Sequence, residues 1–146
     1  MRPVPTVCRP LCSNVRGLAG NPLPVASSRY DILLCSETLV SDMRDVSELL
    51  VPGFGRPDLL YPGRMPRAQG MAAYVRDGYG AFRQPKFECG CYEILIFRVC
   101  GARQNLYVFS LYCNPYLDDQ IFDCLLTSMA AVQAEVVRAS FLFVGI

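Results

Sequence analysis

The chain has 146 residues, a formal net charge of +1, and a hydrophobic fraction of 52%. This length fits one domain with a buried core, and the balanced charge excludes nucleic-acid binding by bulk electrostatics alone. The apolar content argues against a disordered chain, and no apolar run is long enough to span a bilayer. We therefore expect a single domain over residues 1–146, with no membrane partner.

The N-terminal stretch MRPVPTVCRPLC interrupts any apolar run with Pro and Arg, unlike a signal peptide, so we expect an intracellular protein, nuclear or cytoplasmic and not secreted. The sequence contains no histidine, which excludes mechanisms that use histidine as acid, base or ligand. Its cysteines lie mostly in apolar stretches of the sequence, which predicts free, buried thiols, with a metal site or disulfides as the alternative. They stand at positions 8, 12, 35, 89, 91, 100, 113 and 124.

The first third of the chain predicts two strands and a helix. Residues 6–15 indicate a strand that Pro10 confines to an edge or a bulge. Residues 31–36, DILLCS, form a continuous apolar run typical of a strand buried on both faces. Apolar residues at 39, 43, 46 and 50 then follow helical spacing, with a start at Ser41-Asp42 and an end at Pro52-Gly53.

The middle of the chain predicts a long loop followed by three strands. Residues 52–70 are rich in Pro, Gly and Arg, and the strand MAAYVR follows them. DGYGAF, residues 77–82, indicates a turn. YEILIFRV at 92–99 and NLYVFSLY at 105–112 are strong strand patterns, and the short Gly-containing connection between them predicts a hairpin.

The last third predicts one helix and one strand. Residues 118–138 carry the clearest helical stripe, and the apolar strand SFLFVGI follows it. The stripe comprises Ile121, Leu125, Met129, Val132 and Val136, with Phe122 and Leu126 beside it. Because a hairpin implies antiparallel pairing, we expect an α/β or α+β fold with a mixed sheet and at least one covering helix.

Five short motifs in this order resemble the endonuclease/exonuclease/phosphatase superfamily: NVRGL, SET, GMAAYV, SLYCNP and FLFVG. Within it, the motifs are most similar to those of the endonuclease domain of non-LTR retrotransposon polyproteins. Apurinic/apyrimidinic endonucleases are relatives of that domain. The resemblance implies part of a four-layer α/β-sandwich with a mixed sheet and flanking helices. It also implies a Mg²⁺-dependent DNA endonuclease that hydrolyses phosphodiesters.

The resemblance assigns roles to individual residues of this chain. Asn14 matches the Asn that holds the scissile phosphate and the catalytic water, and Glu37 matches the magnesium ligand. Tyr112, followed by Asn114, matches the Tyr whose hydroxyl contacts the phosphate. A hard cation held by carboxylate oxygen suits phosphodiester hydrolysis, since it neutralises the charge that develops in the transition state.

Each residue also has an ordinary interpretation. Asn14 could cap the turn at Gly17, Glu37 could be a solvated loop carboxylate or begin a helix, and Tyr112 could be a half-buried strand aromatic. Asn114-Pro115 alone is a turn signal. The arginines of the long loop could contact a DNA backbone or simply be solvated. These are Arg56, Arg64 and Arg67.

The sequence departs from the family pattern at Gly145, which is followed by Ile146 rather than by the Asp of a G-D-x-N motif. A closing S-D-H motif is absent too. We therefore expect a truncated domain that lacks the C-terminal half of the fold, binds Mg²⁺ weakly and has little or no activity.

Half of a sandwich would leave FLFVGI and LYVFSLY poorly covered and favour self-association. A non-catalytic interaction or remnant protein on half of a nuclease fold is the alternative. An unrelated small α/β domain is a third possibility, which a different strand order would favour.

Overall fold

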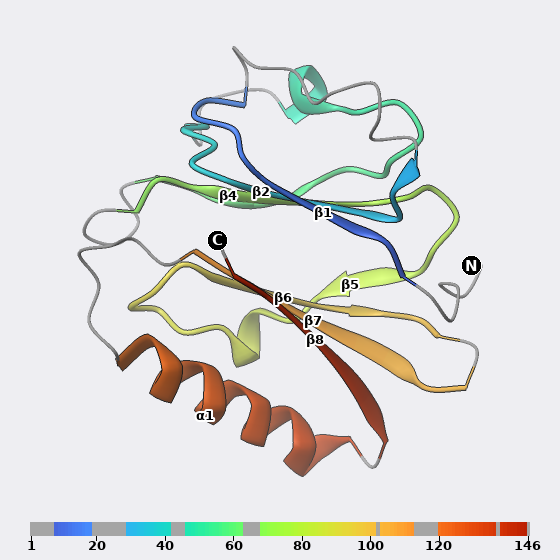
Figure 1. Ribbon diagram of the computed structural model, residues 1–146, viewed down its shortest axis with the longest axis vertical. Helices are drawn as coiled ribbons and strands as arrows, with labels where there is room; N and C mark the ends of the chain where they lie inside the picture. Colours follow the sequence, from blue (N-terminus) through green and yellow to red (C-terminus); the bar gives the residue numbers. More distant parts are fainter. Residues whose placement is uncertain are drawn as a thin grey trace.

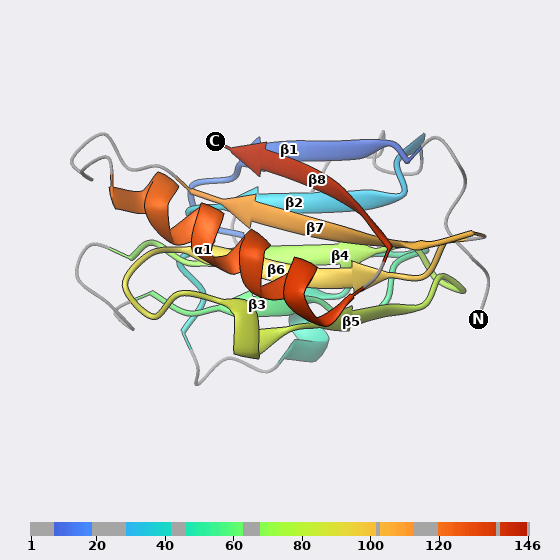
Figure 2. The same ribbon diagram turned by 90° about the horizontal axis from the view of Figure 1, so that it is seen from below.

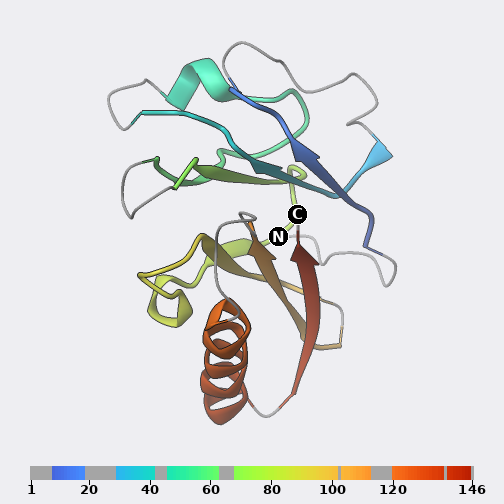
Figure 3. The ribbon, with the colours of Figure 1, turned by 60° about the vertical axis from the view of Figure 1, so that its left-hand side comes forward.

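Two four-stranded sheets lie face to face in this computed structural model, which describes residues 8–18, 29–41, 46–62, 68–101, 103–112, 120–136 and 138–145. The strand orders are β1-β2-β4-β3 and β5-β6-β7-β8. Helix α1 covers the outer face of the second sheet (Figures 1 and 3). Each sheet mixes parallel and antiparallel pairs, so the predicted mixed α+β sandwich is confirmed.

The first sheet contains β1 (Pro10–Asn14), β2 (Ile32–Ser36), β3 (Asp58–Leu60) and β4 (Met71–Val75). β1 pairs in parallel with β2, whereas β4 is antiparallel to both β2 and β3. Every residue of β2 is buried, as its continuous apolar run predicts. Pro10 begins the edge strand β1, where the missing N–H of proline is tolerated.

The second sheet contains β5 (Ala81–Arg83), β6 (Ile94–Val99), β7 (Asn105–Leu111) and β8 (Ala139–Gly145). The predicted hairpin is the antiparallel pair β6–β7. β8 returns after helix α1 and pairs in parallel with β7. The turn predicted at DGYGAF extends only to Gly80, because Ala81 and Phe82 already belong to β5.

The main core fills the space between the two sheets. Alternate residues point inward from each strand, for example Ile32 and Leu34 from β2 and Leu95 and Phe97 from β6. The residues between them point outward into two further clusters, as the two-residue period of a strand requires. Both faces of each sheet are therefore covered by apolar side chains.

Helix α1 (Gln120–Glu135) packs its predicted stripe on the second sheet, with Ile121 and Val132 buried. The Ser128 hydroxyl donates a hydrogen bond of 2.6 Å to the carbonyl of Phe87, in the short 3-10 helix η3 (Pro85–Phe87). Phe122 and Leu126, beside the stripe, are exposed. No helix within the described ranges is long and apolar enough to cross a membrane.

The helix expected between Ser41 and Pro52 is wrong as predicted. Among the described residues this stretch contains only the 3-10 helix η2 (Val46–Leu49), and residues 42–45 lie outside the description. Leu39 and Leu50, two of the four stripe residues, are exposed. The positive φ of Leu39, 53°, keeps this first stripe residue out of any right-handed helix, and of the 3-10 helix only Leu49 is buried, so the apolar spacing does not form one buried face.

The long loop predicted over residues 52–70 contains strand β3, which sequence reasoning missed. Both β3 and β5 have only three residues, too few for an alternating pattern to stand out. Their pairing with β4 and β6 forms them, since short edge strands depend on the ladder of a longer neighbour. Tertiary pairing therefore decides what the local sequence leaves open.

The expected exposure of the C-terminal strands is also wrong for β7, in which Tyr107 through Leu111 are buried between helix α1 and the first sheet. β8 is half-covered, and Phe143 keeps 43% of its surface exposed. Figure 2 shows that β1 and β8, each at one edge of its own sheet, lie on the same side of the molecule. What stays open is this pair of edges rather than an inner sheet face.

Candidate active site

Three of the predicted site residues meet where strands of the two sheets end. Asn14 is the last residue of β1, Glu37 follows β2, and Tyr112 follows β7 of the other sheet. Parallel pairing sets Asn14 opposite Ser36, which brings the carboxyl ends of β1 and β2 to the same edge. The Tyr112 hydroxyl donates a hydrogen bond of 2.5 Å to Glu37 Oε1, and Asn14 also hydrogen-bonds the Glu37 side chain.

The hydrogen bonds at Glu37 favour its ionised form. The bond from Tyr112 and then the bond from Asn14 lower the pKa of Glu37, against the opposing effect of burial, and the nearby charge of Arg16 lowers it further. Burial, with the hydrogen bond and charge of Glu37, raises the pKa of Tyr112 to about 12. At neutral pH the pair is therefore a carboxylate and a protonated phenol.

The backbone around this cluster is strained. Arg16, Glu37 and Leu39 have φ values of 47°, 53° and 53°, in the left-handed region that non-glycine residues rarely adopt. Each such residue costs on the order of 1 kcal/mol, so the surrounding contacts must hold the backbone in place. Strain of this kind gathers at functional sites, and here it includes Glu37 itself.

Glu93 is a site residue that sequence reasoning missed. Its side chain is 4% exposed and lies just before β6. Glu93 Oε1 accepts hydrogen bonds from the backbone N–H groups of Gly70 and Gln69, at 2.7 Å and 3.1 Å. An acidic residue preceding an apolar strand is too common to signal such a role, so only the fold reveals it.

The segment that Glu93 holds in turn supports the Glu37 loop. The carbonyls of Gly70 and Gln69 accept hydrogen bonds from the N–H groups of Thr38 and Leu39, at 3.2 Å and 3.0 Å. Gly70 has a φ of +92°, and a Cβ at this position would come within 2.5 Å of Thr38 Oγ1. Glycine is therefore required at position 70. Glu93 thus supports Glu37 indirectly, because it binds the backbone of Gln69 and Gly70, which in turn binds the backbone of Thr38 and Leu39 beside Glu37.

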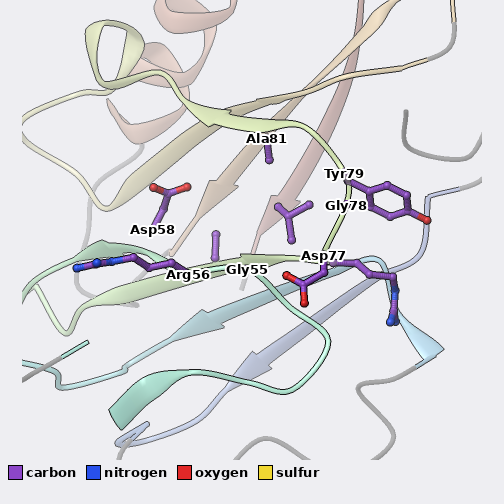
Figure 4. A pocket seen from close by; sticks show the side chains of 10 residues that line it. Gly55, Arg56, Asp58, Asp77, Gly78, Tyr79 and Ala81 are labelled. Atoms are coloured by element: carbon purple, nitrogen blue, oxygen red, sulfur yellow. The ribbon is translucent and has the colours of Figure 1, made fainter. Parts of the chain in front are cut away.

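Arg56 does not lie beside this cluster. The N–H of Gly55 bonds to the carbonyl of Val75, whereas Ser36 pairs with Met71 at the other end of β4. Arg56 lines a pocket of about 220 Å³ together with Asp58 and Asp77 (Figure 4). The pocket therefore belongs to the opposite end of the sandwich from Glu37. Arg64, Arg67 and Asn114 lie outside the described residues.

The oxygen donors near Glu37 fit a weakly held hard cation. Mg²⁺ commonly takes one or two carboxylates and completes its coordination with water and phosphate oxygens. Glu37 supplies the ionised carboxylate, and Asn14 contributes an amide beside it. The buried hydroxyls of Ser36 and Thr38, on either side of Glu37, have no hydrogen-bond partner within the described ranges. No cluster of three or more classical ligand side chains occurs among those residues.

Two solved structures share this architecture. The endonuclease domain of TRAS1, a telomere-specific non-LTR retrotransposon, superimposes with a TM-score of 0.58 at 15% identity, covering 95% of this chain. The catalytic domain of Xenopus laevis APE2 gives a TM-score of 0.63 at 16% identity over 92% of this chain. The chain has an endonuclease/exonuclease/phosphatase-type fold.

The match extends over most of this chain but over only part of the compared domains. This chain spans 58% of the TRAS1 endonuclease domain and 57% of the APE2 catalytic domain. No protein-family model matches the sequence, and no curated protein matches it either. The resemblance read from five short motifs is thus confirmed at the level of the fold. The shared fold gives no support to the third possibility, which a different strand order would have favoured.

Proposed function

We propose that this chain carries part of the active site of a Mg²⁺-dependent DNA endonuclease of the non-LTR retrotransposon type. The observation that carries the proposal is the hydrogen-bonded cluster of Asn14, Glu37 and Tyr112. It unites the ends of three strands from two sheets, on a fold shared with two nuclease domains. Because those likenesses concern the fold, the reaction rests on the side chains of this chain.

The proposed roles follow from the charge and hydrogen-bonding capacity of each group. Glu37 and the Asn14 amide oxygen would hold Mg²⁺, which when bound neutralises negative charge on the phosphate undergoing attack. The Asn14 amide can alternatively donate to a phosphate oxygen without adding negative charge. The Tyr112 hydroxyl stays protonated at neutral pH, so it can orient Glu37 and donate toward a phosphate.

We expect cleavage by this chain to be slow. Its sequence contains no histidine, so the acid–base pair that the resemblance implies is not supplied by these 146 residues. Groups that stabilise one transition state act as a unit, and removing some of them loses most of the rate. Binding of Mg²⁺ and of DNA depends on fewer groups and is a second measurable consequence of the proposal.

The direct test is nicking of supercoiled plasmid by the purified chain, with Mg²⁺ and with EDTA. Glu37→Ala should reduce Mg²⁺-dependent nicking by about 100-fold, the scale of losing one transition-state contact. Tyr112→Phe should have a smaller effect, since the Asn14 bond to Glu37 remains. Glu48→Gln, an exposed carboxylate on η2, is the matched control and should nick like the wild type.

Nicking that EDTA does not abolish, or that survives Glu37→Ala, would contradict this assignment. The absence of nicking together with the absence of Mg²⁺-dependent DNA binding would contradict it as well. DNA binding that needs Mg²⁺ and Glu37, without cleavage, would retain the site and assign the missing chemistry to groups outside this chain.

A non-catalytic interaction role is the second candidate, favoured by apolar side chains on the surface. Phe122 and Leu126, one turn apart on α1, are exposed, and so is Phe143 on the edge strand β8. Self-association through that edge would appear as a concentration-dependent mass in sedimentation equilibrium. Phe143→Ser should abolish it while leaving any nicking unchanged.

A further inference from the structure

Three thiols gather where helix α1 meets the loop before β6, away from the Glu37 cluster. Cys89 and Cys91 follow η3, and Cys124 lies in the first turns of α1. Cys89 Sγ and Cys124 Sγ are 3.4 Å apart, and the N–H of Cys91 donates to Cys89 Sγ at 3.4 Å. All cysteines within the described residues are free; Cys35 is buried as predicted, whereas Cys12 and Cys91 are exposed.

We propose that Cys89 and Cys124 form a reversible redox pair, which a low-molecular-weight disulfide such as oxidised glutathione converts into an intramolecular disulfide. The sulfur atoms already lie within about 1.5 Å of bonding distance. Both side chains are partly accessible, so a small oxidant can reach them. The pair lies outside the proposed nuclease site and does not depend on it.

The two thiols differ in the way that thiol–disulfide exchange requires. Burial alone would raise the pKa of the Cys89 thiol, but hydrogen bonds from Cys91, Cys124 and the Tyr92 backbone lower it overall. Burial, together with the hydrogen bond to Cys89, raises the pKa of Cys124 to about 11. Cys89 is therefore the attacking thiolate, and Cys124 is the resolving thiol held beside it.

The exchange balances in two steps. The Cys89 thiolate attacks one sulfur of oxidised glutathione, which forms a mixed disulfide and releases one glutathione thiolate. Cys124 then loses its proton to solvent and attacks the Cys89 sulfur, releasing the second glutathione thiolate. In total, two cysteine thiols are oxidised, one glutathione disulfide is reduced to two thiols, and two protons pass to the released thiolates.

The new bond would fasten helix α1 to the loop that leads into β6. At present a hydrogen bond from Ser128 to Phe87, an exposed ion pair between Lys86 and Glu135, and the shared apolar cluster make that attachment. A covalent link across 35 positions of sequence restricts the unfolded chain. We therefore expect the oxidised protein to unfold at a temperature about 10 °C higher than the reduced protein.

The test is to expose the reduced, folded chain to oxidised glutathione and trap free thiols by alkylation. Intact mass should show the loss of two hydrogens, and tryptic mapping should link residues 87–98 to residues 104–138 through Cys89 and Cys124. The same oxidation in denaturant should give a mixture of pairs, which ties the specificity to the fold. A Cys89–Cys91 link, or glutathione adducts without any internal link, would overturn the proposal.

Variants assign the roles of the two thiols. Cys124→Ser should stall at a glutathione adduct on Cys89, whereas Cys89→Ser should react at least about 10-fold more slowly than the wild type. Cys100→Ser, at the end of β6, is the matched control and should still form the Cys89–Cys124 bond. Persistence of the link between the two peptides in Cys124→Ser would assign it to Cys113 and overturn the pair.

Discussion

Two carboxylates at opposite ends of the first sheet are held in contrasting ways. Asp31 precedes β2, is 1% exposed, and lies 3.5 Å from Arg9 and 3.8 Å from Arg76. It also accepts hydrogen bonds from the Tyr79 hydroxyl and the Arg9 N–H. Glu37 follows β2 and is held by two neutral donors, Tyr112 and Asn14, on a left-handed backbone.

The contrast separates a structural carboxylate from one suited to binding. The guanidinium groups of Arg9 and Arg76 offset the negative charge of Asp31, so this carboxylate has no uncompensated charge with which to bind a cation. Two neutral donors orient Glu37 and, with a further contribution from the nearby charge of Arg16, favour its ionised form. The proposed Mg²⁺ site therefore uses Glu37 and not Asp31, although the two residues are only six positions apart in the sequence.

The largest expected effect comes from Asp31→Asn, which leaves its arginines facing an uncharged group. Losing this buried carboxylate's two ion pairs and weakening the hydrogen bonds that it accepts costs about 3 kcal/mol of unfolding free energy. Urea denaturation monitored by circular dichroism measures this loss. Glu37→Gln keeps an amide oxygen that can accept the hydrogen bond from Tyr112, and should lose less than about 1 kcal/mol. Equal losses in the two variants would break the comparison.

A smaller effect is expected at the loop that supports Glu37. Gly70→Ala would place a methyl group against Thr38 Oγ1 in addition to straining a φ of +92°, and should cost about 2 kcal/mol. Gly78→Ala is the matched control, because its φ is +89° and a Cβ there would meet nothing within 4 Å. It should lose about 1 kcal/mol from the backbone alone. The difference between the two, from thermal or urea unfolding, measures how tightly the Glu37 loop is packed.

The smallest expected effect concerns pH and Glu93. Burial raises the pKa of Glu93, against the hydrogen bonds from Gly70 and Gln69, and the charge of Glu37 raises it further. A folded-state pKa above the ordinary 4.5 stabilises the fold fully below that pH, and this contribution is lost as pH rises through the raised value. Stability of the wild type should therefore fall over that window.

Glu93→Gln removes the titration and should flatten the profile there. Urea midpoints measured at several pH values would show it, with Glu48→Gln, an exposed carboxylate, as a control that follows the wild type. Parallel plots of stability against pH for Glu93→Gln and the wild type would show that neither burial nor the charge of Glu37 shifts the pKa of Glu93.

Much of the sandwich could be predicted because its long elements carry strong patterns. The continuous apolar run at Ile32–Ser36, the hairpin of β6 and β7, and the stripe of α1 are each specified locally. β3 and β5 could not be predicted in this way, since three residues form a strand only when a longer partner is present. The apolar spacing from Leu39 to Leu50 predicted a helix, whereas the described part of that stretch forms only the 3-10 helix η2 and leaves Leu39 and Leu50 exposed.

The sequence by itself determined the strand patterns, the helix and the order of five motifs, because burial periodicity and turn residues act over short distances. It also supplied Asn14, Glu37 and Tyr112 as separate candidates. Only the tertiary structure decided that these side chains touch, that Arg56 lies at the other end, and that Glu93 supports the loop. Such contacts join residues up to 75 positions apart, and only the pairing and stacking of two sheets can bring them together.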